Sequence, residues 1–187
     1  MKAPAARWSG GVIALHWLSA AGLALVFALG LAATAAGGDA ARKFDLYQTH
    51  KALGWLTLVL LAARLVARAA RAAPPPAPSW SKATRWGSGF VHAALYALLA
   101  AVPLIGWLRV SSAIVPIPVS LFGVATIPNI APIDAVFSED MAFAHKLAGW
   151  ALATLVALHA AAALKHQFGD RDAILSRMWP GAGGRTP

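Results

Sequence analysis

Cysteine is absent from the 187 residues of this chain, and charged side chains are scarce. The lack of thiols excludes disulfides, iron–sulfur clusters, thiolate zinc sites and haem attached through a Cys-x-x-Cys-His motif. Charged residues make up 12% of the chain, about half the usual share in a soluble domain. Together with 59% hydrophobic residues and a mean hydropathy of +0.62, this indicates an integral membrane protein.

Four apolar stretches are long enough to cross a bilayer: residues 12–36, 48–70, 88–110 and 141–165. The first is too long to be a cleaved signal peptide. We therefore predict an all-α membrane protein, a four-transmembrane-helix up-and-down bundle. The predicted membrane domain covers residues 1–180, and the glycine-rich residues 181–187 are expected to form a flexible tail.

Basic residues are unevenly divided between the two sides of this topology. The side that holds both termini has eleven Lys or Arg residues and two acids, whereas the other side has five of each. The positive-inside rule then predicts that both termini are cytoplasmic and that the protein is multi-pass. The net charge of +9 is thus expected to anchor the chain in its lipid, and no basic face with interleaved aromatics indicates a nucleic-acid partner.

The connections between the spans predict one bundle. The run from Pro74 to Pro78 predicts a stiff inner link, and Gly37-Gly38-Asp39 ends the first span. Residues 111–139 form a long, rather apolar outer loop, in which Val119 to Gly123 are expected to make an interfacial turn or short helix over the bundle mouth. No internal repeat is evident.

The histidines fall at matched depths. We expect three histidines towards the cytoplasm (His16, His92 and His159), two towards the opposite side (His50 and His145) and one at the inner surface (His166). Histidine inside a membrane span is costly and is often functional, although a single one is more commonly an interhelical hydrogen-bonding group. Depth-matched sets are harder to explain in that way.

The spacing of the histidines suits two haems. His145 and His159 are fourteen residues apart, about 21 Å of helical rise, and project from nearly the same face. A bis-histidine haem needs two imidazoles that face each other across the bundle. His50 can pair only with His145, whereas His159 can pair with His16 or His92, and spacing does not choose between them. Copper or zinc is less suitable because the two sets are far apart, and a proton relay would favour Asp or Glu inside the spans, where none is found.

The ordered motifs resemble those of the bacterial cytochrome b561 family over nearly the whole chain. The matching elements are His16-Trp17, His50-Lys51-x-x-Gly54, Arg64-Leu65, His92 with Tyr96, Pro103 to Gly106, Pro118 to Gly123, His145-Lys146 and His159 to His166. This resemblance implies a four-helix cytochrome of the bacterial inner membrane with two haem b groups.

The resemblance also implies the ligand pairs and the reaction. It implies that His16 and His159 hold the inner haem iron, that His50 and His145 hold the outer one, and that His92 is not a ligand. Some members of the family resemble superoxide oxidases, which pass electrons from periplasmic superoxide through two haems to ubiquinone. The expected function is therefore that of a superoxide:ubiquinone oxidoreductase. The alternative is an electron-conducting cytochrome b subunit that links a periplasmic redox partner to the quinone pool.

Charged residues near the two haems are the remaining site candidates. Lys51, Lys146 and Arg109 are expected to attract superoxide at the outer mouth, because a cationic entrance raises the encounter rate of a small anion. On the inner side, His92, His166, Lys165 and Arg64 are candidates for binding quinone or the haem periphery, or for delivering protons. The sequence leaves the oligomeric state open.

Overall fold

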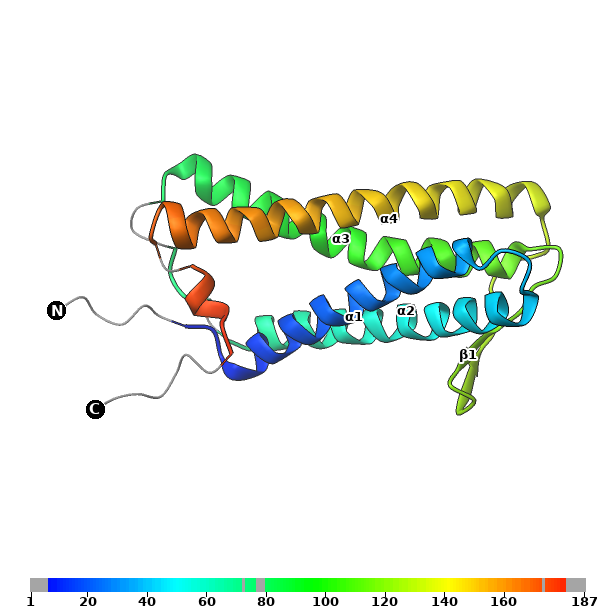
Figure 1. Cartoon of the computed structure of the whole chain (residues 1–187). Coiled ribbons are helices and arrows are strands. Elements are labelled where there is room, and N and C mark those ends of the chain that lie inside the picture. The colour runs from blue at the N-terminus through cyan, green and yellow to red at the C-terminus, as the bar shows by residue number, and fades with distance from the viewer. Residues whose placement is uncertain (1–6, 72, 77–79, 173, 181–187) are drawn as a thin grey trace.

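Four long helices make up most of the protein, as a computed structural model shows (Figure 1). The structure describes residues 7–71, 73–76, 80–172 and 174–180. The helices are α1 (Gly10–Ala35), α2 (Ala40–Ala69), α3 (Lys82–Ser112) and α4 (Ala135–Leu164). All four are long and apolar enough to cross a membrane, which confirms the predicted four-helix membrane bundle. The tail at 181–187 and the Ala77-Pro78 end of the proline link lie outside the described residues.

Three of the helices begin six to eight residues before the apolar stretches do. Each begins where a side chain caps the first turn: Asp39 accepts from the Arg42 amide, Ser81 from Thr84 and Asp134 from Phe137. The turn between α1 and α2 takes only four residues, and Gly37 adopts a φ of +58° there. Capping chemistry therefore extends the helices into polar sequence beyond the bilayer core.

The outward faces of the helices are apolar. Large side chains such as Val66, Phe90 and Leu147 are exposed on the isolated protein. In a membrane these surfaces contact lipid, which is as apolar as the side chains, so association of the helices depends on packing and polar contacts inside the bundle.

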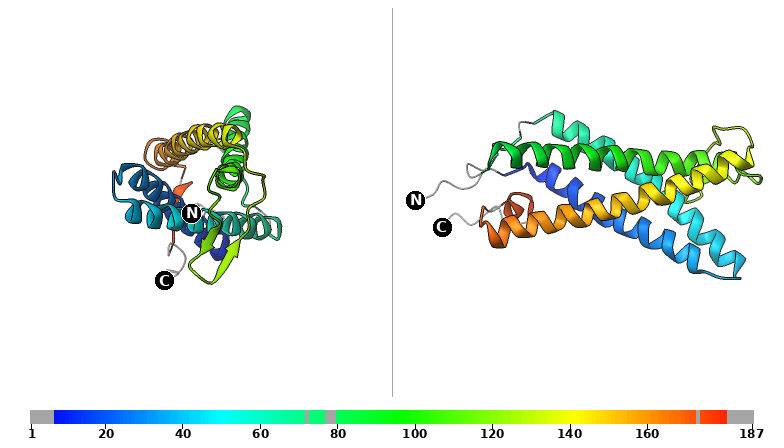
Figure 2. Two further views of the ribbon diagram at one scale, coloured as in Figure 1. Left: turned by 90° about the vertical axis from the view of Figure 1, so that its right-hand side faces the viewer. Right: turned by 90° about the horizontal axis from the view of Figure 1, so that it is seen from above.

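The helices are packed as two hairpins. α1 packs along α2 and α3 along α4, with far fewer contacts between the hairpins, most of them between α2 and α3 (Figures 1 and 2). The chain direction alternates, and the Trp8 amide donates to the Arg177 carbonyl, so both ends of the described chain lie at the same end of the bundle. We call this the inner end and the opposite one the outer end.

Contrary to expectation, the chain contains a short internal repeat. Residues 50–55 read His-Lys-Ala-Leu-Gly-Trp at the outer part of α2, and residues 145–150 read His-Lys-Leu-Ala-Gly-Trp at the outer part of α4. The matching positions lie in equivalent helices of the two hairpins. The two segments share four residues, His, Lys, Gly and Trp. So short a match is easily overlooked in a chain of nearly uniform apolar composition.

The outer connection differs from its predicted form. Val119–Leu121 forms strand β1, which pairs antiparallel with β2 (Ala125–Ile127), and residues 122–124 make the turn, so part of the expected segment is a turn but none of it is helical. This hairpin projects beside the outer end of α2 (Figure 1). The buried Val119 side chain and the β-branched Thr126 and Ile127 of β2 favour strands over a helical turn here.

The C-terminal segment closes the inner end of the bundle. The π-helical turn η1 (Lys165–Gly169) and the 3-10 turn η2 (Leu175–Met178) follow α4. Trp17 Nε1 donates to the Met178 carbonyl at 2.7 Å, and Arg177 Nη1 donates to the Pro75 carbonyl at 2.7 Å. These contacts tie the first helix, the proline link and the end of the chain together.

Candidate functional site: two layers of histidines

The outer layer consists of His50 on α2 and His145 on α4. Their ring centroids are 6.0 Å apart and their planes are nearly perpendicular, at 82°. His50 Nδ1 lies 2.8 Å from the Val26 carbonyl of α1, and His145 Nδ1 lies 2.9 Å from the Val102 carbonyl of α3. Since each Nδ1 donates to a carbonyl, each Nε2 keeps a free lone pair, which is the tautomer of a metal-ligating histidine.

A glycine of the neighbouring helix makes room for each outer imidazole. A Cβ added to Gly30 would lie 3.0 Å from His50 Cε1, and one added to Gly106 would lie 3.0 Å from His145 Nδ1. Each glycine is four residues after the valine whose carbonyl accepts the hydrogen bond. The two rings are thus fixed in the same way, by one helical turn of the adjacent helix.

The inner layer brings together three histidines and an arginine. His16 on α1 and His159 on α4 have ring centroids 6.4 Å apart, and His92 on α3 lies 5.2 Å from His159. Arg64 of α2 places Nη2 3.2 Å from His16 Nδ1 and its guanidinium 5.5 Å from the centre of the Tyr96 ring. The structure therefore gathers His16, His92 and His159, which the sequence places at one depth, and adds Arg64 to them.

These distances fit bis-histidine iron. Two metal–nitrogen bonds of about 2.0 Å, with about 1.2 Å from each nitrogen to its ring centre, separate the centroids by roughly 6.4 Å. The His50–His145 and His16–His159 separations agree with that value. The His92–His159 separation of 5.2 Å is about 1 Å too short for an iron between the rings. The spacing therefore suits haem at both layers and favours His16 over His92 as the partner of His159. Arg64 only donates, so His16 Nδ1 accepts here and His16 Nε2 carries the proton; Arg64 has to turn away from Nδ1 before His16 Nε2 can bind iron.

The outer cations occupy different settings. Lys51 Nζ donates to the carbonyls of Ile117 and Pro118, at 3.1 and 3.3 Å, and so holds the outer loop against α2. Lys146 is exposed on α4. Arg109 acts electrostatically on both outer histidines. The charge of Arg109 therefore bears on both outer histidines, whereas Lys51 has a loop-binding role that its sequence position did not indicate.

Two of the inner candidates belong to a separate cluster. His166 Nδ1 lies 3.1 Å from Asp170 Oδ2 and 2.8 Å from Asp172 Oδ2, and Lys165 pairs with Asp170 at 3.0 Å. The Trp80 ring centroid lies 5.4 Å from that of His166, with the planes tilted by 37°, and Trp80 Nε1 donates to Asp172 Oδ2 at 2.9 Å. Lys165 and His166 thus form an ionic group at the inner surface, about 10 Å of helix beyond His159.

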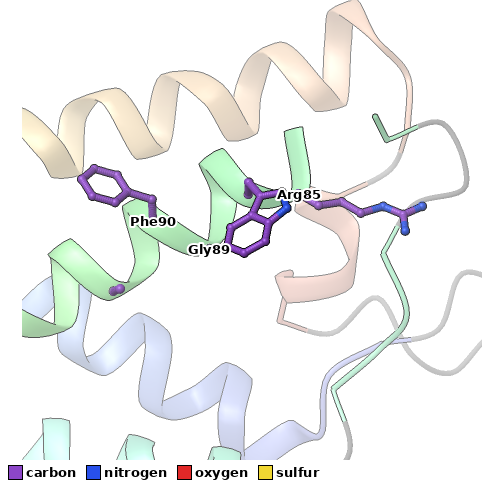
Figure 3. Close-up of a pocket in the computed structure, with 5 residues that line it drawn as sticks. Arg85, Gly89 and Phe90 are labelled. Atoms are coloured by element: carbon purple, nitrogen blue, oxygen red, sulfur yellow. The ribbon is translucent and has the colours of Figure 1, made fainter. Parts of the chain in front are cut away.

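A shallow apolar groove runs along the inner half of α3. Its cavity volume is about 440 Å³, and it is lined by Arg85, Trp86, Gly89, Phe90 and Ala93 (Figure 3). The Trp86 and Phe90 side chains are 81% and 74% exposed, so the groove opens to the lipid rather than into the bundle. His92 lies on the same stretch of α3.

The sequence reasoning missed the two glycines and the two valine carbonyls that hold the outer imidazoles. The signal that could have found them is a shared spacing: Gly30 follows His16 by fourteen residues, and Gly106 follows His92 by fourteen.

Facing imidazole pairs in a four-helix membrane bundle without cysteine define the class of b-type membrane cytochromes. The profile of the family described as prokaryotic cytochrome b561 matches residues 7–181. The chain is also 37% identical over 171 residues to cytochrome b561 homolog 2 of Escherichia coli (strain K12). The matched region covers 90% of this chain and 89% of the relative. The chain therefore belongs to the prokaryotic cytochrome b561 family, and its role is that of a haem b protein in membrane electron transfer.

Proposed function

We propose that this cytochrome carries two haems b and oxidises superoxide on its outer side while reducing ubiquinone on its inner side. The observation that carries the proposal is the presence of two imidazole pairs with iron-compatible spacing, one towards each end of the bundle. His50 and His145 hold the outer iron, and His16 and His159 hold the inner one. When bound, the haems supply one-electron redox chemistry on both sides of the membrane.

The net reaction balances two one-electron oxidations against one two-electron reduction. Two superoxide anions lose one electron each to give two molecules of dioxygen, and one ubiquinone takes up both electrons and two protons to give ubiquinol. With both termini in the cytoplasm, as the basic residues predict, superoxide reacts on the periplasmic side of the inner membrane. Arg109 and Lys146 attract the anion there, while Lys51 keeps the outer loop in place.

The inner residues supply quinone contacts and protons. His92 and Arg64 lie beside the inner imidazoles and are suited to binding a quinone carbonyl. His166 and Lys165 are linked to two carboxylates at the surface and are suited to relaying protons from the cytoplasm. The apolar groove with Trp86 and Phe90 offers the isoprenoid tail a lipid-facing surface on the same part of α3.

One observation favours the alternative of an electron-conducting subunit. The outer β-hairpin carries exposed apolar side chains at its turn, with Phe122 64% and Val124 90% exposed. Such a projection offers a surface on which a periplasmic redox protein can dock near the outer pair. In that case electrons reach the quinone pool from a protein donor instead of superoxide.

Rapid mixing of the purified, oxidised protein with superoxide distinguishes the two functions. Superoxide oxidation predicts haem reduction faster than spontaneous dismutation and, with ubiquinone present, stoichiometric formation of ubiquinol. A haem that superoxide leaves oxidised, but that quinol reduces, contradicts the superoxide proposal and supports the subunit. Superoxide dismutase added before mixing is the control, because it removes the donor without touching the cytochrome.

A further inference from the structure

The two hairpins repeat a pattern of residues that extends through both histidine layers. His16, Val26 and Gly30 of α1 have the same spacing as His92, Val102 and Gly106 of α3. In the second helices, the equivalent outer histidines are His50 and His145. Fourteen residues later the first hairpin has Arg64 and the second has His159.

The contacts within the hairpins follow the same correspondence. His50 donates to Val26 and packs on Gly30, just as His145 donates to Val102 and packs on Gly106. At the inner layer, Arg64 contacts His16 within the first hairpin, and His159 contacts His92 within the second. The hairpins are therefore equivalent in structure as well as in sequence, as expected for parallel repeats related by an axis along the membrane normal.

This symmetry implies two equivalent lines across the inner layer, each of which joins the first helix of one hairpin to the second helix of the other. We call these lines diagonals. The outer pair joins equivalent positions of the two hairpins, whereas the inner pair joins His16 of one to His159 of the other. The symmetry-related inner diagonal joins His92 to position 64, where an arginine stands. His92 has a ligand's tautomer on that diagonal, because its Nδ1 lies 2.7 Å from the Ser88 carbonyl and its Nε2 is left with a free lone pair.

Arg64 fills the place of an imidazole on that second diagonal. Its side chain is half-buried, reaches His16 Nδ1 and lies against the ring of Tyr96, one turn beyond His92. A guanidinium has no lone pair for a metal and stays positively charged, so it cannot ligate iron.

We propose that His92 and position 64 mark a second inner ligand position that Arg64 leaves incomplete, and that Arg64 is thereby the positioning residue that confines the inner haem to His16 and His159. This inference rests on the proposed two-haem function, and it explains why His92 has a ligand's tautomer although the inner iron does not use it. It predicts that, once His159 is removed, Arg64→His allows the inner haem to bind on the other diagonal.

Haem content and spectra of four variants test the proposal. His159→Ala is expected to lose the inner haem and to fall from about two haems per chain to about one. Adding Arg64→His is expected to restore a second low-spin bis-histidine signal in electron paramagnetic resonance, with a g-value set different from that of the parent. Arg64→Gln in the same background is the matched control and is expected to restore nothing. A third substitution, His92→Ala, is expected to abolish the restored signal.

The outcomes separate this inference from the proposed function. If Arg64→His restores no haem while the outer haem keeps its signal, or if the restored haem survives His92→Ala, the inference is wrong. Should the His159→Ala background fail to accumulate, the same rescue is expected in His16→Ala, which leaves His92 intact. A parent protein with a single haem would instead contradict the two-haem function itself, and none of these readouts depends on superoxide or quinone turnover.

Discussion

His50 and His145 come from different hairpins and face each other at 6.0 Å, each held by a carbonyl of the helix beside it. A ligand pair of this kind binds its haem only if both imidazoles remain. His145→Ala is therefore expected to remove the outer haem alone and His159→Ala the inner haem alone, so that the pyridine haemochrome assay falls from about two haems per chain to about one in either case. Loss of both haems from one substitution would contradict two independent sites.

The glycines beside the outer imidazoles give a second prediction. Gly30→Ala and Gly106→Ala place a methyl group 3.0 Å from a ring that a hydrogen bond already fixes, and overpacking of this kind costs roughly 1–3 kcal/mol. We expect partial loss or a shifted signal of the outer haem, read by electron paramagnetic resonance, with the inner signal unchanged. Gly22→Ala and Gly89→Ala in the same two helices meet nothing within 4 Å and are expected to resemble the parent.

The inner layer allows the ligand to be distinguished from its neighbour. His16→Ala is expected to abolish the inner low-spin signal, because His16 has the iron-compatible distance to His159. His92→Ala is expected to keep both haem signals and to slow haem oxidation by ubiquinone several-fold. Redox titration with optical detection measures the first effect, and stopped-flow mixing with quinone measures the second. The reverse pattern would show that the third helix supplies the ligand.

Charge at the outer end gives a prediction for superoxide. Arg109→Gln and Lys146→Gln are each expected to slow haem reduction by superoxide by roughly twofold to tenfold and to flatten its dependence on salt, because attraction of a small anion is screened. Reduction by quinol from the inner side is the internal control and should change little. Equal rates in the parent and in both single variants over a salt series would argue against electrostatic attraction. Lys51→Gln is expected to increase hydrogen exchange in the β-hairpin instead, since it removes the bonds to the loop carbonyls.

The hydrogen bond between Trp17 of α1 and the C-terminal segment gives a prediction for stability. Trp17→Phe removes the Nε1 hydrogen bond to the Met178 carbonyl and is expected to cost about 1 kcal/mol, seen as a lower Tm in detergent. Trp86→Phe is the matched control, because the Trp86 side chain is 81% exposed and faces lipid. A similar decrease of Tm in both variants would mean that this hydrogen bond does not contribute to stability.

Hydropathy and histidine spacing predicted most of the architecture. The four helices follow from runs of apolar residues, and the depth of each histidine follows from its place in its run. The helix starts at Ala40, Lys82 and Ala135 did not follow, because Asp39, Ser81 and Asp134 cap them outside the apolar windows. The strands β1 and β2 are three residues each, too short for periodicity to reveal.

The site was harder to predict than the fold. Spacing left His16 and His92 open as partners of His159, and only the ring separations of 6.4 and 5.2 Å favour one over the other. The contacts of Lys51 with Ile117 and Pro118 join residues more than sixty positions apart, which no local pattern encodes. The assignment of each site residue stays a prediction that the variants above can check.

The scarcity of contacts between the two hairpins bears on how the protein is made. Each hairpin can enter the bilayer as an independent unit during translation, because its main helix packing is internal. In the proposed ligand pairs one histidine comes from each hairpin, so a haem bound between them would link the two hairpins. Haem binding would then complete the assembly after both hairpins have entered the membrane. Chain that is made without haem is expected to be degraded faster than chain that is made with it.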